Sequence, residues 1–344
     1  MTEHPVRPDD PPPGILGTGG YLPAETVSNE LVAERAGVTP EWILAKTGIR
    51  GRRYAAAHEA TSDLAVEAAR AALADAGVPA TRLGWIVVAT STPDHPQPAT
   101  ACLVQHRLGA VNAAAFDLNA VCSGFVYALV TAARLIDPGG PARYALVIGA
   151  DLYSRVIDRA DRRTAVLFGD GAGAVVLGPA RPGRGLCGSL LESDGAHHEL
   201  IGVAAGGSRE PASEKTVADG RHFFRMRGRE VSDYVLSRLP RAVHDLLKAE
   251  RVDPGCVDHF IPHQANGVLL AKALPGLGLP RARTHLTVAE HGNTGAASIP
   301  LALDDARRQG LLGDGELLLL AGFGGGMSLG AALIRWQGDG ARGA

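Results

Sequence analysis

The chain repeats one order of segments in its two halves, and this repeat constrains its fold more than any other feature. A segment of helical period leads into "IVVAT" (86–90) in the first half and into "HFIPH" (259–263) in the second. "AVCSGFVYAL" and then "ALVIGAD" follow the first, while "HGNTGAASIPLAL" and then "LLLLAGF" follow the second. Thr90 and His263 are 173 residues apart, and Asp151 and Phe323 are 172 residues apart. The constant offset predicts a duplicated α/β unit.

Within each unit, buried strands should alternate with helices. Runs rich in Val, Ile and Leu predict strands at 85–90, 144–151 and 316–323. Alanine-rich periodicity predicts a helix over 61–77, with Thr61 or Ser62 as N-cap and Gly77 as its stop. A second helix is predicted over 228–250, with a kink at Pro240. We expect halves 1–180 and 181–344, each contributing one sheet, with helices between and outside the two sheets.

Composition excludes several classes of function. With 344 residues and a formal net charge of −2, the chain lacks the excess of Lys and Arg that bulk nucleic-acid binding requires. The four cysteines lie far apart, without zinc-ligand spacing, so we expect neither disulfides nor a metal site and infer a reducing cytoplasm. The amino-terminal segment is polar and proline-rich, and no apolar run is long enough to span a bilayer. "GTGGYLP" lacks the spacing of a dinucleotide-binding loop.

One cysteine lies where an extended run turns into a helix. In "AVCSGFVYAL", Cys122 is followed by the small residues Ser123 and Gly124, which would let a substrate carbonyl approach the backbone. The amino-terminal end of a helix favours a thiolate, the nucleophilic form that attacks thioesters and other acyl donors. A buried structural cysteine is the alternative that this segment alone leaves open.

The second half supplies two hydrogen-bonding side chains at corresponding positions. His263 in "PHQAN" can act as acid, base or N–H donor, and Asn293 in "HGNTGAAS" is a donor that never ionises. Such a pair can hold an enolate or thioester oxygen without adding a competing base. Because the repeat places both near Cys122, the combination favours a catalytic site over three unrelated structural residues.

These segments resemble the Cys–His–Asn triad of β-ketoacyl-acyl-carrier-protein synthase III, in the thiolase superfamily. The resemblance covers nearly the whole chain and includes "EWILAKTGIR", "FGDGAGAVVLG" and "GFGGGMSLGAALIRW". It implies an α/β, thiolase-like five-layer αβαβα fold, a homodimer, and a ping-pong reaction without a cofactor. An acyl group from acyl-CoA would load onto Cys122, and a malonyl thioester would then lose carbon dioxide and condense with it.

The resemblance also implies roles for individual residues. The backbone N–H groups of Cys122 and Gly325 would form the oxyanion hole, while His263 and Asn293 would hold the thioester carbonyl that becomes an enolate. Phe323 matches the aromatic residue that the family places near its cysteine, in the acyl pocket.

Coenzyme A would bind, by the same resemblance, through Trp42, Lys46, Arg162 and Asn266. Trp42 and Arg162 match the pair that sandwiches the adenine, and Lys46 stands where an arginine often contacts phosphate. The alternatives are a helix-packing role for Trp42 and a solvated loop charge for Arg162.

Two departures from the family pattern concern the substrates. Asp233 and Val268 stand where family members carry basic residues that dock an acidic acyl carrier protein, so carrier docking should be weakened. Four nearby arginines could compensate, namely Arg227, Arg229, Arg238 and Arg241. Gln97 stands at the tip of the loop that caps the partner's acyl pocket in the family, which favours a polar or substituted acyl group over acetyl.

Three functions therefore compete at this point. A condensing enzyme that forms a 3-ketoacyl product is the leading hypothesis. An acyltransferase would keep the Cys122 acyl-enzyme but pass the acyl group to a hydroxyl, an amine or a carrier thiol. A catalytically silent partner subunit is the third, although it predicts the loss of Cys122, His263 and Asn293, all of which are present.

Overall fold

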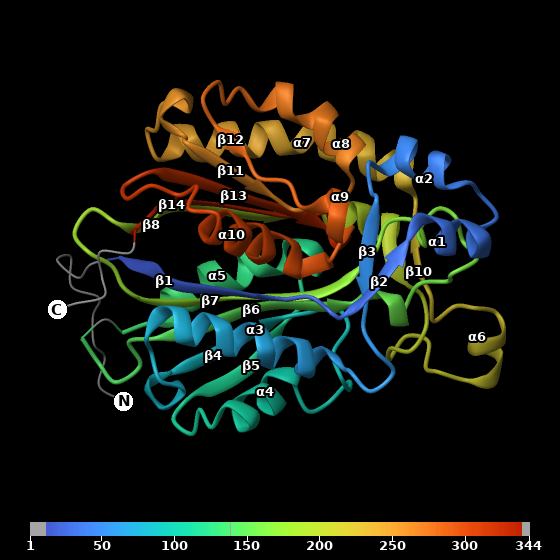
Figure 1. The fold of residues 1–344 in the computed structure, drawn as a ribbon, viewed down its shortest axis with the longest axis horizontal. Helices are drawn as coiled ribbons and strands as arrows, with labels where there is room; N and C mark the ends of the chain where they lie inside the picture. The colour runs from blue at the N-terminus through green and yellow to red at the C-terminus, as the bar shows by residue number, and fades with distance from the viewer. Residues whose placement is uncertain (1–11, 138, 339–344) are drawn as a thin grey trace.

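The computed structural model describes residues 12–137 and 139–338 as two five-stranded sheets with helices between and outside them. Figure 1 shows the layers in the order helix, sheet, helix, sheet, helix, which confirms the five-layer prediction. The first eleven residues, which form most of the polar, proline-rich amino-terminal segment, lie outside the described residues. Among residues 12–137 and 139–338, no helix combines the length and the apolar character needed to cross a membrane.

The two sheets have the same topology. The first has the order β1 (Pro13–Tyr21), β7 (Asp170–Pro179), β6 (Ala145–Leu152), β4 (Trp85–Ala89) and β5 (Ala114–Leu118). The second has the order β8 (Gly185–Ser193), β14 (Ser328–Arg335), β13 (Leu317–Gly324), β11 (His259–Pro262) and β12 (Arg283–Thr284). In each sheet the first three strands pair antiparallel and the last three pair parallel. The repeat in the sequence is therefore a repeat of structure.

The helices form an inner layer and two outer layers. Between the sheets lie α5 (Gly124–Leu135) and α10 (Ser298–Arg308) (Figure 1). Outside the first sheet lie α3 (Thr61–Ala76) and α4 (Thr100–Leu108), and outside the second lie α7 (Gly228–Ala249) and α8 (Gly267–Ala273). Apolar residues of both inner helices and both sheets share one buried core, which requires α5 to be apolar on most of its faces.

Shorter elements cover one end of the layers. They are β2 (Glu25–Ser28) paired with β3 (Gly51–Tyr54), β9 (Ile201–Val203) paired with β10 (Phe224–Met226), and the helices α1 (Asn29–Ala36), α2 (Pro40–Thr47), α6 (Glu214–Ala218) and α9 (Val288–His291). Figure 1 shows those that it labels toward one end of the layers.

The predicted bounds of the helices and strands agree with the structure to within one residue, but the predicted N-cap of α3 does not. Gly77 ends this helix in the left-handed conformation, and α7 continues through Pro240. The predicted N-cap is wrong, because Ala60 occupies that position and the Asp63 side chain accepts its backbone N–H at 2.7 Å. The hydroxyl of Thr61 donates instead to the Thr92 carbonyl, and that of Ser62 donates to Asp94. Both candidate caps thus serve tertiary contacts.

The glycines of "GTGGYLP" serve packing and not phosphate binding. They lie in β1, which pairs antiparallel with β7. A Cβ at Gly19 would lie 2.4 Å from the carbonyl oxygen of Ala68 in α3, so glycine is needed for the helix to pack this closely. This arrangement agrees with the rejection of a dinucleotide-binding loop.

The two halves touch through a reciprocal pair of glycines. A Cβ at Gly149 in β6 would lie 2.3 Å from the carbonyl oxygen of Ala296, at the start of the second inner helix segment. A Cβ at Gly322 in β13 would lie 2.9 Å from Cα of Ser123, at the start of the first. Gly149 and Gly322 are again 173 residues apart, as are Ser123 and Ala296. In each half, a glycine of the central strand thus allows the backbone at the start of the other half's inner helix to pack directly against it.

We expect Gly149→Ala to destabilise the protein. The added methyl group must displace backbone of the other half, and overpacking of this kind costs about 1–3 kcal/mol. The free energy of unfolding from urea titration measures the effect, and Gly195→Ala is the control because its Cβ would meet nothing within 4 Å. Equal unfolding free energies for the two variants would contradict the tight contact.

Candidate active site

The nucleophile lies on a sharp turn between β5 and α5. After β5 the chain passes through a 3₁₀ turn, Val121–Ser123, before α5 begins at Gly124. Val121 has a φ of 49°, a conformation that costs a β-branched residue about 1–3 kcal/mol. The turn leaves Cys122 at the start of the helix, 8% exposed and lining a cavity. The predicted position of the cysteine is therefore observed.

Its protonation state differs from the prediction. Burial raises the pKa of the Cys122 thiol well above its ordinary value, and the neighbouring Asp151 carboxylate raises it further. Interaction with the Tyr153 phenol lowers this pKa, but the effect of burial is larger. The thiolate expected from the helix start is thus wrong for the resting enzyme, because an enclosed site disfavours the charged sulfur.

His263 follows β11 and is almost fully buried, at 1% exposure. Its Nδ1 lies 2.7 Å from the hydroxyl oxygen of Ser298, which also accepts the backbone N–H of Gln264 at 3.3 Å. Burial lowers the pKa of His263 to about 3, so the imidazole is neutral at physiological pH. A serine hydroxyl can donate or accept, so Ser298 can hold either neutral tautomer.

Asn293 is fixed at both its backbone and its side chain. Its backbone N–H donates to the Leu167 carbonyl at 2.8 Å, and its carbonyl accepts the N–H of Gly169 at 3.0 Å. The side-chain Oδ1 accepts the N–H of Gly295 at 3.0 Å. This bond orients the amide, so that the Nδ2 hydrogens remain for a substrate oxygen.

One cavity of about 470 Å³ brings the three side chains together. Cys122, His263 and Asn293 all line it. Phe323 also lines the cavity, and its ring meets the His263 ring edge-on with centroids 5.1 Å apart. The sulfur, imidazole and amide of the predicted triad therefore face one enclosed space.

The residues proposed to bind coenzyme A also line this cavity. Trp42 is half-buried, whereas Lys46 and Arg162 are exposed. Asn266 has a structural task, because its Oδ1 accepts the N–H groups of Val268 and Leu269 and thereby caps α8. Its contact with coenzyme A remains a prediction.

Gly325 and Gln97 are the two predicted site residues that do not line this cavity. Gly325 begins a 3₁₀ turn, Gly325–Met327, and its neighbour Gly324 lines the cavity, where a Cβ would lie 2.7 Å from the Cys122 nitrogen. The oxyanion-hole role of Gly325 remains a prediction. Gln97 is exposed and does not line the cavity of its own subunit, so its place in a partner's pocket also remains a prediction.

The sequence analysis missed a buried polar chain behind the cysteine. Ser91 donates its hydroxyl to Asp151 at 2.9 Å, and the Tyr153 hydroxyl lies 2.9 Å from the Ser91 hydroxyl. Asp151 also accepts the N–H of Ala296 from the other half at 2.8 Å. Burial raises the pKa of this carboxyl to about 6. The sequence marked only the position of Asp151, by its offset of 172 residues from Phe323, and gave no sign of its polar contacts.

The expected carrier-docking face carries acidic as well as basic side chains. Asp233 is exposed on α7, and Arg238 is engaged in an ion pair with Glu192. Arg227 lies 3.6 Å from Glu199. Of the four arginines considered as compensation, these two are paired with acidic side chains.

Comparisons with known proteins agree with this geometry. The model of 3-oxoacyl-[acyl-carrier-protein] synthase III matches residues 116–195, and the model of its C-terminal part matches residues 247–336. An acetoacetyl CoA synthase, NphT7 of Streptomyces sp. (strain CL190), is 54% identical over 325 residues, which are 94% of this chain and 98% of the relative. The chain belongs to the 3-oxoacyl-acyl-carrier-protein synthase III family.

Other relatives carry the family's own name. A β-ketoacyl-[acyl-carrier-protein] synthase III of Rhodospirillum centenum is 48% identical over 94% of this chain and 98% of its own length. The crystal structure of the synthase III from Pseudomonas aeruginosa PAO1 superposes with a TM-score of 0.86 at 40% identity, covering 95% of this chain and 99% of that one. The chain is thus an acyl-thioester condensing enzyme of the ketoacyl synthase III type. Its described residues include no cluster able to hold a metal ion.

We expect alkylation of Cys122 by iodoacetamide to be slow at pH 7 and still rising at pH 9. Only the thiolate reacts, and burial raises the pKa of this thiol, so the reactive fraction grows throughout that interval. Peptide mass spectrometry measures the rate at each pH, with Cys122→Ser as the control for the assigned peptide. A rate already constant between pH 6 and pH 8 would indicate a resting thiolate–imidazolium pair instead.

Proposed function

We propose that the enzyme transfers an acyl group from acyl-CoA to Cys122 and then condenses it with a malonyl thioester. The observation that carries this proposal is the shared cavity. Its inner end holds Cys122, His263 and Asn293, and its mouth holds an aromatic ring, Trp42, and the cationic side chain of Arg162. These are the groups that a thioester carrying an adenine nucleotide requires at its two ends.

The loading step uses neutral groups on both sides. Since the thiol and imidazole are both uncharged at rest, His263 accepts the proton from Cys122 as the sulfur attacks the thioester carbonyl. The backbone N–H groups of Cys122 and Gly325 hold the oxygen that becomes negative. The C–S bond to coenzyme A breaks, and the proton passes from His263 to the departing thiolate.

The condensation step uses the same side chains as donors. The malonyl group loses carbon dioxide, and the electron pair of the broken C–C bond forms an enolate. An N–H of His263 and the Asn293 amide stabilise its oxygen. The carbanion then attacks the acyl carbonyl on Cys122, the C–S bond breaks, and the Cys122 thiolate that leaves takes a proton from solvent water. A 3-ketoacyl thioester is the product.

The acceptor thioester is proposed to be malonyl-CoA, with the acyl carrier protein as a poorer partner. Asp233 places a negative charge on the face where an acidic carrier would dock, and Arg238 is paired with Glu192. The Streptomyces relative is an acetoacetyl CoA synthase, which supports a coenzyme A product for this enzyme.

The acyl group is proposed to be short, with acetyl as the first candidate. Tyr153, Phe168 and Phe224 pack against one another, and the two phenylalanines line the cavity. This packing limits the space beside the cysteine. The polar acyl group suggested by Gln97 is the competing prediction, and a panel of acyl-CoA donors distinguishes the two by which one loads Cys122 fastest.

Assembly as a homodimer is also part of the proposal. β5 is an edge strand of the first sheet, and its residues are only partly buried in the single subunit. An uncovered edge of this kind can pair with the same strand of a second copy. Placement in the cytoplasm fits a thiol nucleophile and four free cysteines, which need a reducing compartment.

We expect Asn293→Ala to separate the two half-reactions. The enolate loses a fixed donor, which lowers condensation by about 100-fold or more, whereas loading of Cys122 continues. Intact-mass spectrometry measures the acyl adduct, and release of labelled carbon dioxide from malonyl-CoA measures condensation, with Cys122→Ala as the blank. An adduct in the wild type without carbon dioxide release would favour the acyltransferase, and the absence of any adduct would favour a silent subunit.

Asp233→Lys should improve use of a malonyl-acyl carrier protein without changing use of malonyl-CoA. Replacing a negative with a positive charge on the docking face raises the association rate with an acidic carrier, by about threefold to tenfold at low salt. The ratio of kcat/KM for the two acceptors measures this effect, and added salt should remove the gain. An equal change for both acceptors would contradict a docking role for this face.

A further inference from the structure

Two adjacent arginines line the cavity from the loop between Arg155 and β7, but only one of them forms an ion pair. Arg162 and Arg163 both line the cavity. Arg163 forms a two-pronged ion pair with Asp161, through Nε at 2.9 Å and Nη2 at 3.1 Å. Among residues 12–137 and 139–338, the Arg162 side chain has no hydrogen bond or ion pair. Its guanidinium is thus available to a ligand, and the backbone of the loop sets its position.

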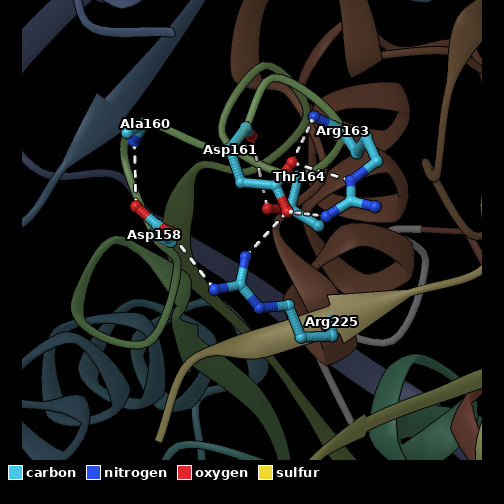
Figure 2. A network of polar contacts seen from close by, with 6 residues as sticks. All are labelled: Asp158, Ala160, Asp161, Arg163, Thr164 and Arg225. Carbon is cyan, nitrogen blue, oxygen red and sulfur yellow. Dashed lines mark hydrogen bonds and ion pairs between the residues drawn. The ribbon is translucent and has the colours of Figure 1, made fainter. Parts of the chain in front are cut away.

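Two aspartates shape that backbone. The Asp158 carboxylate accepts the N–H of Ala160 at 3.0 Å, and the Asp161 carboxylate accepts the N–H of Arg163 at 3.0 Å. The Asp161 carbonyl accepts the N–H of Thr164 at 3.0 Å. Figure 2 shows the bonds around Asp158 and Asp161. Arg162 lies between Asp161 and Arg163 in the sequence, and therefore within the turn that Asp161 closes.

A single guanidinium from another part of the chain joins the two turns. Arg225 donates from Nη1 to Asp161 at 2.8 Å and from Nη2 to Asp158 at 3.2 Å (Figure 2). The Asp161 side chain is only 8% exposed, so little water competes for this bond. A lysine could not span both carboxylates in this way, because it presents one compact charge and not a planar fork.

Arg225 is itself anchored to the inner end of the cavity. It is the central residue of β10, between Phe224 and Met226, which both line the cavity. Because side chains alternate along a strand, Arg225 points to the opposite side, toward the loop. The Phe224 N–H donates to the carbonyl of Val156 at 2.7 Å, where the loop begins. β10 thus connects the aromatic packing near Cys122 with the turn that carries Arg162.

We propose that Arg225 is a positioning residue for coenzyme A: by bridging Asp158 and Asp161 it fixes the turn that presents Arg162 to the adenine nucleotide. The inference rests on the proposed function, in which acyl-CoA is the donor. A purely structural ion pair would change stability only, and at 43% exposure Arg225 contributes little to it. If Arg225 acted only through its charge, the KM for acetyl-CoA would depend on the net charge at the cavity mouth and not on the bridge.

The first test compares two donors that differ in the nucleotide. For Arg225→Gln we expect the KM for acetyl-CoA to rise by about threefold to tenfold, with kcat unchanged, since a loosened Arg162 loses part of its stacking on the base. Acetyl-pantetheine lacks the nucleotide, so its kcat/KM should not change. Arg221→Gln is the matched control, because it removes an exposed arginine that pairs with Glu210 nearby.

Two further variants separate positioning from charge. Asp158→Asn makes the mouth more positive, so an electrostatic role predicts a lower KM for the anionic acetyl-CoA, whereas loss of the bridge predicts a higher one. In Arg162→Ala, the added substitution Arg225→Gln should raise the KM no further, because the residue being positioned is absent. Arg225→Lys should not restore the wild-type KM.

The failures are distinguishable. If the wild type loads no acyl-CoA onto Cys122, the proposed function fails. If the wild type loads it but Arg225→Gln leaves the KM unchanged, changes acetyl-pantetheine equally, or adds its full effect to Arg162→Ala, the positioning role is overturned while the proposed function stands. A lower KM for Asp158→Asn likewise overturns positioning in favour of charge.

Discussion

The reciprocal approach of each central strand to the helix start of the other half is the constraint on which the site depends. Gly149 and Gly322 carry no side chain, so the backbone at Ala296 and at Ser123 can lie against them. A serine pair at the same seam, Ser123 and Ser328, joins the halves with hydroxyl oxygens 2.7 Å apart. Because the first half brings the cysteine and the second brings the histidine and the amide, neither half holds a complete site. Close packing between the copies is what makes the chemistry possible.

The same packing determines the protonation of the site. Burial raises the pKa of the Cys122 thiol and lowers that of His263, so the resting pair is uncharged. A neutral imidazole can accept the thiol proton during loading and can later donate an N–H to the enolate, whereas a resting imidazolium could only donate. Ser298 is suited to both states, since its hydroxyl rotates. An ion pair would make the sulfur more reactive but would remove the base, so the neutral pair is the state that the two proposed uses of His263 require.

Features that follow from the order and spacing of segments could be predicted from the sequence. Features that depend on the burial of a side chain or on a partner far away in the chain could not. The constant offset was enough to predict the paired sheets and to bring Cys122 and His263 together, because topology follows from the order of elements. The thiolate was predicted wrongly because the helix start is visible in the sequence and its burial is not. Thr61 was predicted as an N-cap because local preference cannot show that Thr92 claims its hydroxyl. The bridge made by Arg225 lies more than sixty residues from its partners, and no local pattern marks it.

Aromatic packing holds the inner end of the cavity, whereas ion pairs hold its mouth, and β10 connects the two. Near Cys122 the aromatic side chains are buried and uncharged, and Phe224 packs closely with Tyr153 and Phe168. At the mouth, Arg162 is exposed and charged, and packing cannot hold it. Ion pairs there are individually weak, but a guanidinium that binds two turns at once limits the motion of the whole loop. Alternation along the three residues of β10 therefore lets Phe224 pack near Cys122 while Arg225 reaches the loop that carries Arg162, and in the proposed complex this one strand would link the thioester end of the cavity to the nucleotide end.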